Sequence, residues 1–307
     1  MNDDIAVLMC TFNGEKYIKK QIDTILNQRN ANVTLFIRDD GSSDKTVKII
    51  EKYAAFYPEK VIVVKNIGLH LGPGLGFMRL FFYVFTKYNK YSYYAFADQD
   101  DIWMKNKLNT GVIQLRNLKT PGLYCSNVYL YKDNRVMGLR TQSIPDLTLE
   151  GHIMKNTING CTFLFNLEMA RTLYKGGIPD KRILLLRCHD SWIIMVAILT
   201  GKVLYDNEAH MYYRIHSKND VGVRTHLSLK KRVEKYGSIF PYYGLWRKTA
   251  KNLKQRYTTC SEQLEVLNTF YNYNKGLINR LRFFNYICDI YDGNKVELFI
   301  KVMCSYV

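Results

Sequence analysis

The sequence has few acidic residues for its basic content. Its 307 residues include 27 Asp and Glu against 44 Lys and Arg, so the formal net charge is +17 at pH 7 and the pI is about 9.4. This imbalance favours an anionic partner, such as nucleic acid, an acidic membrane surface or a phosphorylated substrate. No uncharged apolar run reaches the length of about 18 residues needed to cross a bilayer, so we expect no transmembrane helix.

Signal-peptide features and paired cysteines are also missing. The start of the sequence is acidic before a short apolar run, and we expect no signal peptide. The seven cysteines form no CxxC pair and show no His/Cys metal spacing. Most lie among apolar residues, which favours buried thiols in a reducing compartment. We therefore expect a cytoplasmic protein, with peripheral contact to the inner face of the cell membrane as a further expectation.

Apolar runs alternate with helical patterns in the first hundred residues. The pattern predicts strands at 5–10, 33–38, 61–65 and 93–97, with helices over 15–28, from about 45, and over 77–88. This is the alternation of a parallel sheet with crossover helices, and it predicts an α/β fold. Further strands are predicted at 123–131, 159–166, 203–205 and 210–215, with a helix over 191–199.

The composition shifts near residue 225. Between Ser228 and Arg256 there are nine Lys and Arg but one acid, with aromatic residues interleaved. We expect an α/β domain over 1–225 and a helical, basic and aromatic C-terminal region over 226–307. The basic stretch 228–256 suits contact with an anionic membrane surface, and the alternative is a solvated helical face packed on the rest of the protein.

Polar turns follow three of the predicted parallel strands. They are Thr11–Glu15, Asp39–Asp44 and the acidic turn with Asp98, Asp100 and Asp101. The carboxyl ends of parallel strands share one edge of a sheet, so we expect these turns to meet in one crevice. Carboxylate oxygens suit Mg²⁺ or Mn²⁺, whereas the simpler interpretation is an acidic turn in solvent.

Six motifs in order resemble glycosyltransferase family 2 on the GT-A fold. They are TFNGEKYI at 11–18, DDGSSDKT at 39–46, NIGLHLGP at 66–73, DQDDIWMKNKL at 98–108, HDSW at 189–192 and YRIHSKNDVG at 213–222. The sequences of these motifs are most similar to those of bacterial polysaccharide rhamnosyltransferases. The resemblance implies a mostly parallel central sheet flanked by helices, with the basic helical region as an extension.

The resemblance also implies an activity. The expected reaction is inverting transfer of a sugar from a nucleoside-diphosphate donor to a glycan or polyprenyl-linked acceptor in cell-surface polysaccharide synthesis. A donor of dTDP-rhamnose is favoured, with UDP-hexoses and hence glucosyl or galactosyl transfer next. The implied cofactor is Mn²⁺ or Mg²⁺.

Site residues follow from the matched motifs, one position at a time. Asp98 and Asp100 match the DxD element, with Asp100 as the metal ligand and His216 closing over the ion and the diphosphate. Asp190 matches the catalytic base. The remaining matches are Thr11, Phe12 and Glu15 in the nucleotide pocket, Asp39 and Asp40 at the base or ribose, and Trp192 facing the acceptor. Phe12 and Ser191 depart from the family pattern, which usually has Tyr and an aromatic residue there.

Simpler interpretations remain for several residues. Asp39 and Asp40 could cap the following helix, and His189 could be a buried core histidine. A different class of function is a non-catalytic protein that binds nucleic acid through its basic segment. No nucleic-acid recognition motif is present, and acids at the cleft would repel a phosphate backbone, so we expect no nucleic-acid partner.

Overall fold

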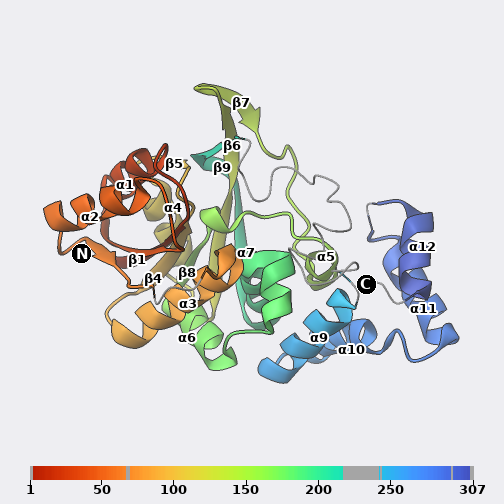
Figure 1. Cartoon of the computed structure of the whole chain (residues 1–307). Helices are drawn as coiled ribbons and strands as arrows, with labels where there is room; N and C mark the ends of the chain where they lie inside the picture. The colour runs from red at the N-terminus through yellow and green to blue at the C-terminus, as the bar shows by residue number, and fades with distance from the viewer. Residues whose placement is uncertain (1–2, 67–69, 217–241, 243, 292, 305–307) are drawn as a thin grey trace. The chain divides into compact units, whose positions relative to one another are not determined.

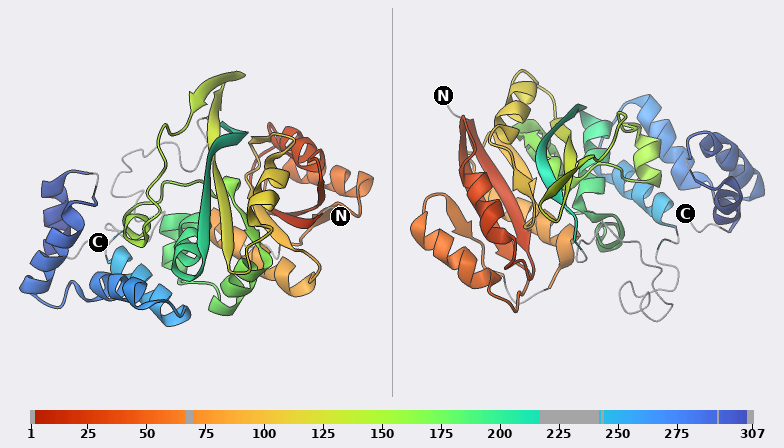
Figure 2. Two further views of the ribbon diagram at one scale, coloured as in Figure 1. Left: turned by 180° about the vertical axis from the view of Figure 1, so that it is seen from behind. Right: turned by 90° about the horizontal axis from the view of Figure 1, so that it is seen from above.

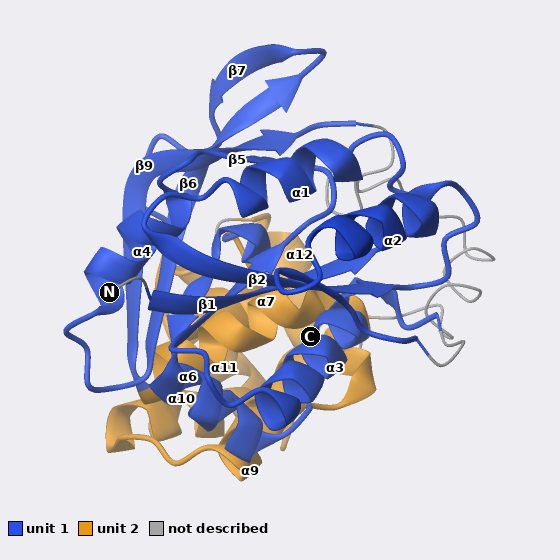
Figure 3. Ribbon diagram, turned by 90° about the vertical axis from the view of Figure 1, so that its left-hand side faces the viewer, with its two compact units in different colours: residues 1–145, 158–178, 201–224 blue, residues 146–157, 179–200, 225–307 orange. Residues whose placement is uncertain are grey.

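The computed structural model describes residues 3–66, 70–216, 242, 244–291 and 293–304 (Figure 1). The chain forms two compact units, shown in blue and orange in Figure 3. Unit 1 comprises residues 1–145, 158–178 and 201–224, and unit 2 comprises residues 146–157, 179–200 and 225–307. Of the predicted site residues, Asp190 and Trp192 belong to unit 2 and the others to unit 1.

Unit 1 is built on a mixed sheet with the strand order β3-β2-β1-β4-β8-β6-β9-β5, and β7 pairs with β6. Strands β1 (Asp3–Thr11), β2 (Ala31–Asp39), β3 (Val61–Val63) and β4 (Tyr93–Ala97) are parallel, as the sequence predicts. The central residues of β1, β2 and β4 are buried and mostly apolar because helices cover both faces of a parallel sheet.

The second half of the sheet is less regular. Strand β8 (Leu164–Asn166) is antiparallel to both β4 and β6 (Gly122–Lys132), and β9 (Lys202–Arg214) is parallel to β6. The two-residue strand β5 (Ile102–Trp103) follows the acidic turn directly and pairs with β9. Strand β7 (Arg135–Leu139) forms a hairpin with β6 that the sequence analysis did not predict.

Helices cover both faces of the sheet of unit 1 (Figures 1 and 2), and a hydrophobic layer on each face holds them to it. On one face Ile5, Val7 and Met9 of β1 join the apolar side chains of α1 (Ile18–Leu26) and α4 (Lys107–Leu115). On the other, Phe81 of α3 (Gly72–Lys87) packs edge to face on Tyr94 of β4. Unit 1 is completed by α2 (Thr46–Phe56), the 3₁₀ turn η1 (Gly160–Thr162) and α6 (Leu167–Gly176).

Several predicted boundaries differ from the structure. The helix predicted from 77 begins at Gly72, because Pro73 is suited to the first helical turn. The stretch 159–166, predicted as one strand, divides into η1 and β8. The strands predicted at 203–205 and 210–215 are parts of the single strand β9, with register shifts in its pairing to β6.

Unit 2 is helical in its described part. Its helices are α5 (Leu149–Met154), α7 (Lys181–Thr200), α9 (Leu245–Arg256), α10 (Ser261–Asn272), α11 (Leu277–Cys288) and α12 (Lys295–Met303). The helix predicted over 191–199 is the second part of α7. A non-helical residue, Cys188 with φ 60°, interrupts α7 two residues before Asp190.

Helix α7 is long and apolar enough to cross a membrane by length and composition alone. However, 61% of its apolar window is buried inside the protein, as in the core helix of a soluble domain. The helical part after Cys188 spans about 18 Å at 1.5 Å per residue, less than the roughly 30 Å of a bilayer core. This helix is therefore weak evidence for a membrane span.

The entry of β9 into the sheet depends on a glycine. A Cβ atom on Gly201 would lie 2.0 Å from the carbonyl oxygen of Pro121, which also accepts a hydrogen bond from the Lys202 amide. Because the obstacle is backbone, it cannot rotate away. We expect Gly201→Ala to lower the free energy of unfolding by about 1–3 kcal/mol or more in urea titrations.

The neighbouring exposed residue provides the control for that substitution. Lys202→Ala removes surface atoms only and should stay within about 0.5 kcal/mol of the wild-type protein. Equal stability of Gly201→Ala and wild type would show that this close approach does not constrain β9.

Candidate active site

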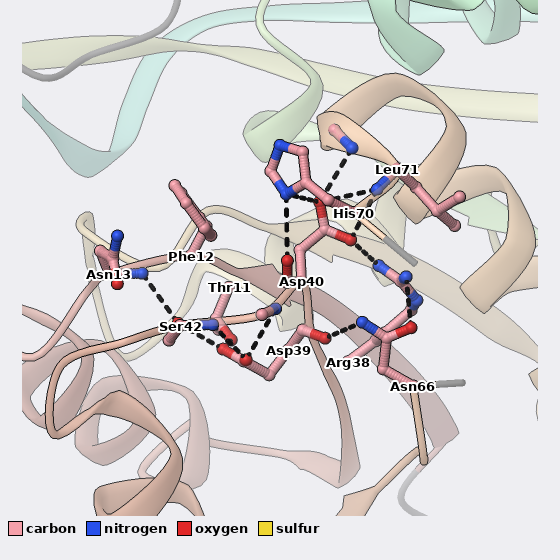
Figure 4. A network of polar contacts seen from close by, with 12 residues as sticks. Thr11, Phe12, Asn13, Arg38, Asp39, Asp40, Ser42, Asn66, His70 and Leu71 are labelled. Atoms are coloured by element: carbon pink, nitrogen blue, oxygen red, sulfur yellow. Dashed lines mark hydrogen bonds and ion pairs between the residues drawn. The ribbon is translucent and has the colours of Figure 1, made fainter. Parts of the chain in front are cut away.

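The turn after β2 is organised by Asp39. Its Oδ1 accepts hydrogen bonds from the hydroxyls of Thr11, at 2.8 Å, and Ser42, at 2.6 Å (Figure 4). Its Oδ2 accepts from the backbone amides of Gly41 and Ser42. The start of α2 is bonded by other acids, since Glu15 accepts from the Lys45 amide and Asp44 from the Thr46 amide. Asp39 therefore shapes the turn and does not cap the helix.

Asp40 is enclosed by donors from the protein. Its Oδ1 lies 2.6 Å from Nη1 of Arg38, and both side chains are buried. The amides of Leu71 and Gly72 donate to the carboxylate, and Nδ1 of His70 lies 3.0 Å from Oδ2 (Figure 4). The charge thus sits at the N-terminus of α3, where the helix dipole favours it. Direct contact of Asp40 with a base or ribose would require exchange of one of these donors.

The turn after β1 is bound to the turn after β4 by Gln99. The Phe12 amide donates to Oε1 of Gln99, and Nε2 of Gln99 donates to the Phe12 carbonyl, both at 3.0 Å. The Phe12 ring is 46% exposed and lies 4.9 Å from the His70 ring. An exposed aromatic pair beside ordered turns can stack on a nucleobase. Gln99 was missed by the sequence analysis, although it lies between Asp98 and Asp100.

The acidic turn after β4 meets the end of β9. Nε2 of His216 lies 2.7 Å from Oδ2 of Asp100, so the structure brings together the two residues predicted at one ion. Arg214 adds two contacts: its Nε donates to the Asp100 carbonyl at 2.8 Å, and its amide donates to Oδ1 of Asp101 at 3.2 Å. The His216 ring stacks on Tyr17, and the guanidinium of Arg214 lies 4.7 Å from the centre of the same ring.

The three acids of this turn have different environments. Asp101 is 1% exposed, while Asp98 and Asp100 are half-buried. Burial raises the pKa of Asp101 well above its usual value, and the neighbouring charges of Asp100 and Asp98 raise it further. A proton on Asp101 removes one of the three repelling charges, and thus the turn tolerates its acidic composition.

Two sets of side chains could hold a cation here. The described residues Asp98, Asp101 and Cys161 place one ligand atom each within 4.8 Å of one another. Burial raises the pKa of the Cys161 thiol well above its usual value, so it stays protonated and is a poor ligand for a hard cation. Asp100 offers carboxylate oxygens and His216, with its Nε2 2.7 Å from Oδ2 of Asp100, offers a nitrogen, and this pair of donors suits Mn²⁺. The residues present therefore fit a divalent ion.

The predicted base and acceptor residues lie in unit 2. Asp190 is partly exposed, and its Oδ1 accepts from the Ser191 amide at 2.7 Å in the first turn after the Cys188 kink. Trp192 is fully buried and packs near Tyr257, so an acceptor cannot touch its ring as it lies here. His189 is buried, and burial lowers its pKa to about 3, so this ring is neutral at physiological pH.

The raised pKa of Asp101 predicts a pH effect on stability. The stability that this raised pKa contributes is fully present below the unfolded pKa of 3.8 and is lost as pH rises through the folded pKa. Asp101→Asn cannot titrate, and its amide oxygen can still accept from Arg214. Its free energy of unfolding should therefore increase relative to that of the wild type as pH rises from the unfolded pKa of 3.8 through the folded pKa.

Urea titrations across this pH range, with a chelator present, measure the difference. Asp133→Asn removes an exposed acid from the β6–β7 turn and controls for net charge. A stability difference between Asp101→Asn and wild type that stays constant with pH would contradict the raised pKa.

Comparisons with known proteins find a matching family model and related sequences. The sequence model of "Glycosyl transferase family 2" matches residues 6–172, more than half of the chain. The dTDP-rhamnosyl transferase RfbG of Shigella flexneri is 29% identical over 75% of this chain and 78% of its own length. An Escherichia coli β-1,3-glucosyltransferase, WfgD, is 27% identical over 55% of this chain and 61% of its own length.

Solved structures share the fold. TarS of S. aureus, residues 1–349 in complex with UDP, aligns over 99% of this chain and 80% of its own with a TM-score of 0.59 and 14% identity. The mannosyltransferase PcManGT of Pyrobaculum calidifontis, in complex with GDP-Man and Mn²⁺, aligns over 97% and 78% with a TM-score of 0.55 and 11% identity. The predicted GT-A fold is confirmed, together with the resemblance to a bacterial rhamnosyltransferase.

Proposed function

The chain belongs to glycosyl transferase family 2, and we propose that it moves a sugar from a nucleoside diphosphate to a hydroxyl of a glycan or lipid-linked acceptor. The observation that carries this proposal is the joining of Asp100 to His216 and Arg214 at the end of β9. This arrangement puts the carboxylate of Asp100 and the imidazole of His216, which can bind a metal ion, beside the positively charged guanidinium of Arg214. Positive charge at this position can stabilise the negative charge of a leaving diphosphate. Family membership removes the alternative of a non-catalytic nucleic-acid-binding protein.

Rhamnose is the first candidate for the transferred sugar. The support is the similarity to RfbG, a dTDP-rhamnosyl transferase matched over three quarters of this chain. UDP-hexoses are the next candidates, because WfgD and WfaP are UDP-Glc-dependent by name and TarS binds UDP-GlcNAc. The acceptors in the names of WfgD and WfaP are sugars on diphosphoundecaprenol, which supports a lipid-linked acceptor for this enzyme. Synthesis of a cell-surface polysaccharide is the process that we propose.

Different residues of the chain are proposed to stabilise the leaving diphosphate and to bind the nucleoside. Arg214 and His216 stand beside Asp100, where they can stabilise charge that grows on a departing diphosphate. A bound Mn²⁺ or Mg²⁺ supplies Lewis-acid stabilisation of the same charge. The exposed ring of Phe12 and the turn held by Asp39 offer a surface for the nucleoside. Thr11 and Glu15 act through the turn, since they bond Asp39 and the Lys45 amide.

Asp190 is the proposed general base. A single displacement at the anomeric carbon needs one group to take the proton of the attacking hydroxyl, and it inverts the configuration. Asp190 lies in the first helical turn after the Cys188 kink and is partly exposed, so its carboxylate can reach solvent. Trp192 is excluded from direct acceptor contact by its burial and is proposed to support the helix that carries Asp190.

A screen of nucleotide-sugars with Mn²⁺, with Mg²⁺ and with a chelator tests the proposal. We expect dTDP-rhamnose with a divalent ion to raise the melting temperature, since a ligand that binds the native state stabilises it. Release of nucleotide should require both the ion and an acceptor. Absence of any thermal shift or nucleotide release with all donors and both ions would contradict the proposed function.

In the same assay, Asp190→Asn separates catalysis from donor binding. Loss of a general base should lower turnover by about 10²–10⁴-fold while the donor-induced thermal shift stays unchanged. Asp289→Asn removes an exposed acid elsewhere in unit 2 and should turn over as the wild-type enzyme does. Near-normal turnover of Asp190→Asn would refute its assignment as the base.

A further inference from the structure

Helices α11 and α12 expose an unusual number of large apolar side chains. The exposed residues are Leu277 (62%), Ile278 (67%) and Leu281 (41%) on α11, and Val296 (69%), Phe299 (40%) and Ile300 (53%) on α12. Within each helix these positions are one, three or four residues apart, which places them on one face. We call these six residues the C-terminal apolar face.

The opposite face of each helix already has its core partners. Phe283 and Ile287 of α11 are buried, as are Leu298 and Val302 of α12. The Phe283 ring contacts Phe270 of α10 at 5.0 Å between centroids. The C-terminal apolar face is therefore additional to the surface that these helices need for folding, since a surface helix normally carries polar residues opposite its buried stripe.

The apolar stripes of the two helices are connected. Phe284 of α11 and Phe299 of α12 pack edge to face at 5.2 Å between ring centroids. Single exposed apolar residues are common on protein surfaces, whereas contiguous ones mark contacts with proteins or membranes. The C-terminal apolar face is contiguous across two helices, and we therefore interpret it as a binding surface.

The positive charge of the C-terminal region favours binding of this face to an anionic surface over binding to a second copy of the chain. Residues 225–307 contain 14 Lys and Arg against 6 Asp and Glu, a net charge of +8. Helix α11 itself carries Arg280 and Arg282 and no acid, and α12 carries Lys295 and Lys301 against one acid, Glu297. Two copies meeting through this region would bring like charges together, while an acidic lipid surface attracts it.

Helix α9 supplies basic charge but little apolar contact surface. Its twelve residues include five Lys and Arg and no acid. Its apolar residues Leu245, Trp246 and Leu253 are buried, and the Trp246 ring packs near Phe270 and Phe283. In its described part the expected membrane segment 228–256 therefore exposes one large apolar residue, Tyr242 (54%), and no apolar face; residues 228–241 and 243 lie outside the described residues.

We propose that the C-terminal apolar face docks the enzyme on an anionic lipid bilayer, with α11 and α12 lying in the interface. Helices of this kind bury their apolar side chains at the acyl boundary and keep Lys and Arg at the headgroups. The proposal rests on the proposed function in one respect, because a lipid-linked acceptor would lie in the same bilayer on which the enzyme docks. The binding itself requires no turnover, so the two proposals can fail separately.

Vesicle co-sedimentation of the full chain tests the proposal. The probes are vesicles of phosphatidylcholine alone and of phosphatidylcholine with phosphatidylglycerol. We expect the wild-type chain to bind the anionic vesicles, and to bind them less as salt increases. Replacing two exposed apolar residues, in Ile278→Glu/Ile300→Glu, should reduce the bound fraction at least about tenfold, because their buried CH₂ and CH₃ groups are lost and negative charge is added.

A matched control carries the same chemical change at other exposed isoleucines. Ile113→Glu/Ile144→Glu replaces residues that are 57% and 70% exposed in unit 1, and it should bind vesicles as the wild type does. Melting temperatures of both variants verify that they fold. Nucleotide release with a water-soluble acceptor should be unchanged in Ile278→Glu/Ile300→Glu, whereas release with an acceptor embedded in anionic vesicles should fall.

Three results would overturn the proposal. The first is a wild-type chain that binds neither vesicle, and the second is equal binding by the two double variants. The third is a wild-type dimer that light scattering detects without lipid and that Ile278→Glu/Ile300→Glu dissociates, since the occupant would then be a second copy. Loss of nucleotide release with every donor, alongside intact vesicle binding, would refute the proposed function and leave the docking surface in place.

Discussion

Crowding of three carboxylates at the end of β4 is the constraint on which the site depends. Asp98, Asp100 and Asp101 lie within four residues, and their mutual repulsion must be offset. The fold buries Asp101, whose raised pKa favours the protonated form, and it sets His216 beside Asp100. Arg214 binds the turn through both its guanidinium and its amide. The turn therefore keeps carboxylates with negative charge close together, where they can bind a divalent ion.

Strand β5 explains how residues far apart in the sequence meet there. Its two residues follow Asp101 and pair antiparallel to Met211 and Tyr212 of β9. The adjacent Met104 amide donates to the His210 carbonyl at 3.0 Å, which extends the pairing by one bond. With this register fixed, Arg214 and His216 must emerge beside the acidic turn. Close packing at Gly201 controls where β9 enters the sheet, and the same strand delivers the site residues at its other end.

The sequence predicts the parallel half of the fold well because its signals are local. Buried strands such as Tyr93–Ala97 are continuous apolar runs, and each is followed by a polar turn. The mixed half was harder to predict, since a short strand such as Ile102–Trp103 has no periodicity and is defined only by its partner β9. The meeting of Asp100 with His216 was expected from a family resemblance, because no local pattern links residues 116 positions apart.

Side-chain environments set the limit of prediction for the site. Asp40 has the motif of a ligand-binding acid, yet Arg38 and the start of α3 surround its carboxylate. Trp192 has a motif position expected to face an acceptor, but it is fully buried. Gln99 exchanges two hydrogen bonds with the backbone of Phe12. Its position between two acids in the sequence does not predict this contact. These outcomes depend on tertiary packing, which residue type and spacing do not determine.

The most direct test of the account is a crystal structure of the protein with Mn²⁺ and the nucleoside diphosphate of its donor, read by anomalous scattering from manganese. We predict a manganese peak within coordination distance of Asp100, bridging to the diphosphate, with the nucleoside beside Phe12. A peak enclosed by Asp98, Asp101 and Cys161 without the diphosphate, or a nucleotide bound away from the ends of β1 and β4, would contradict it.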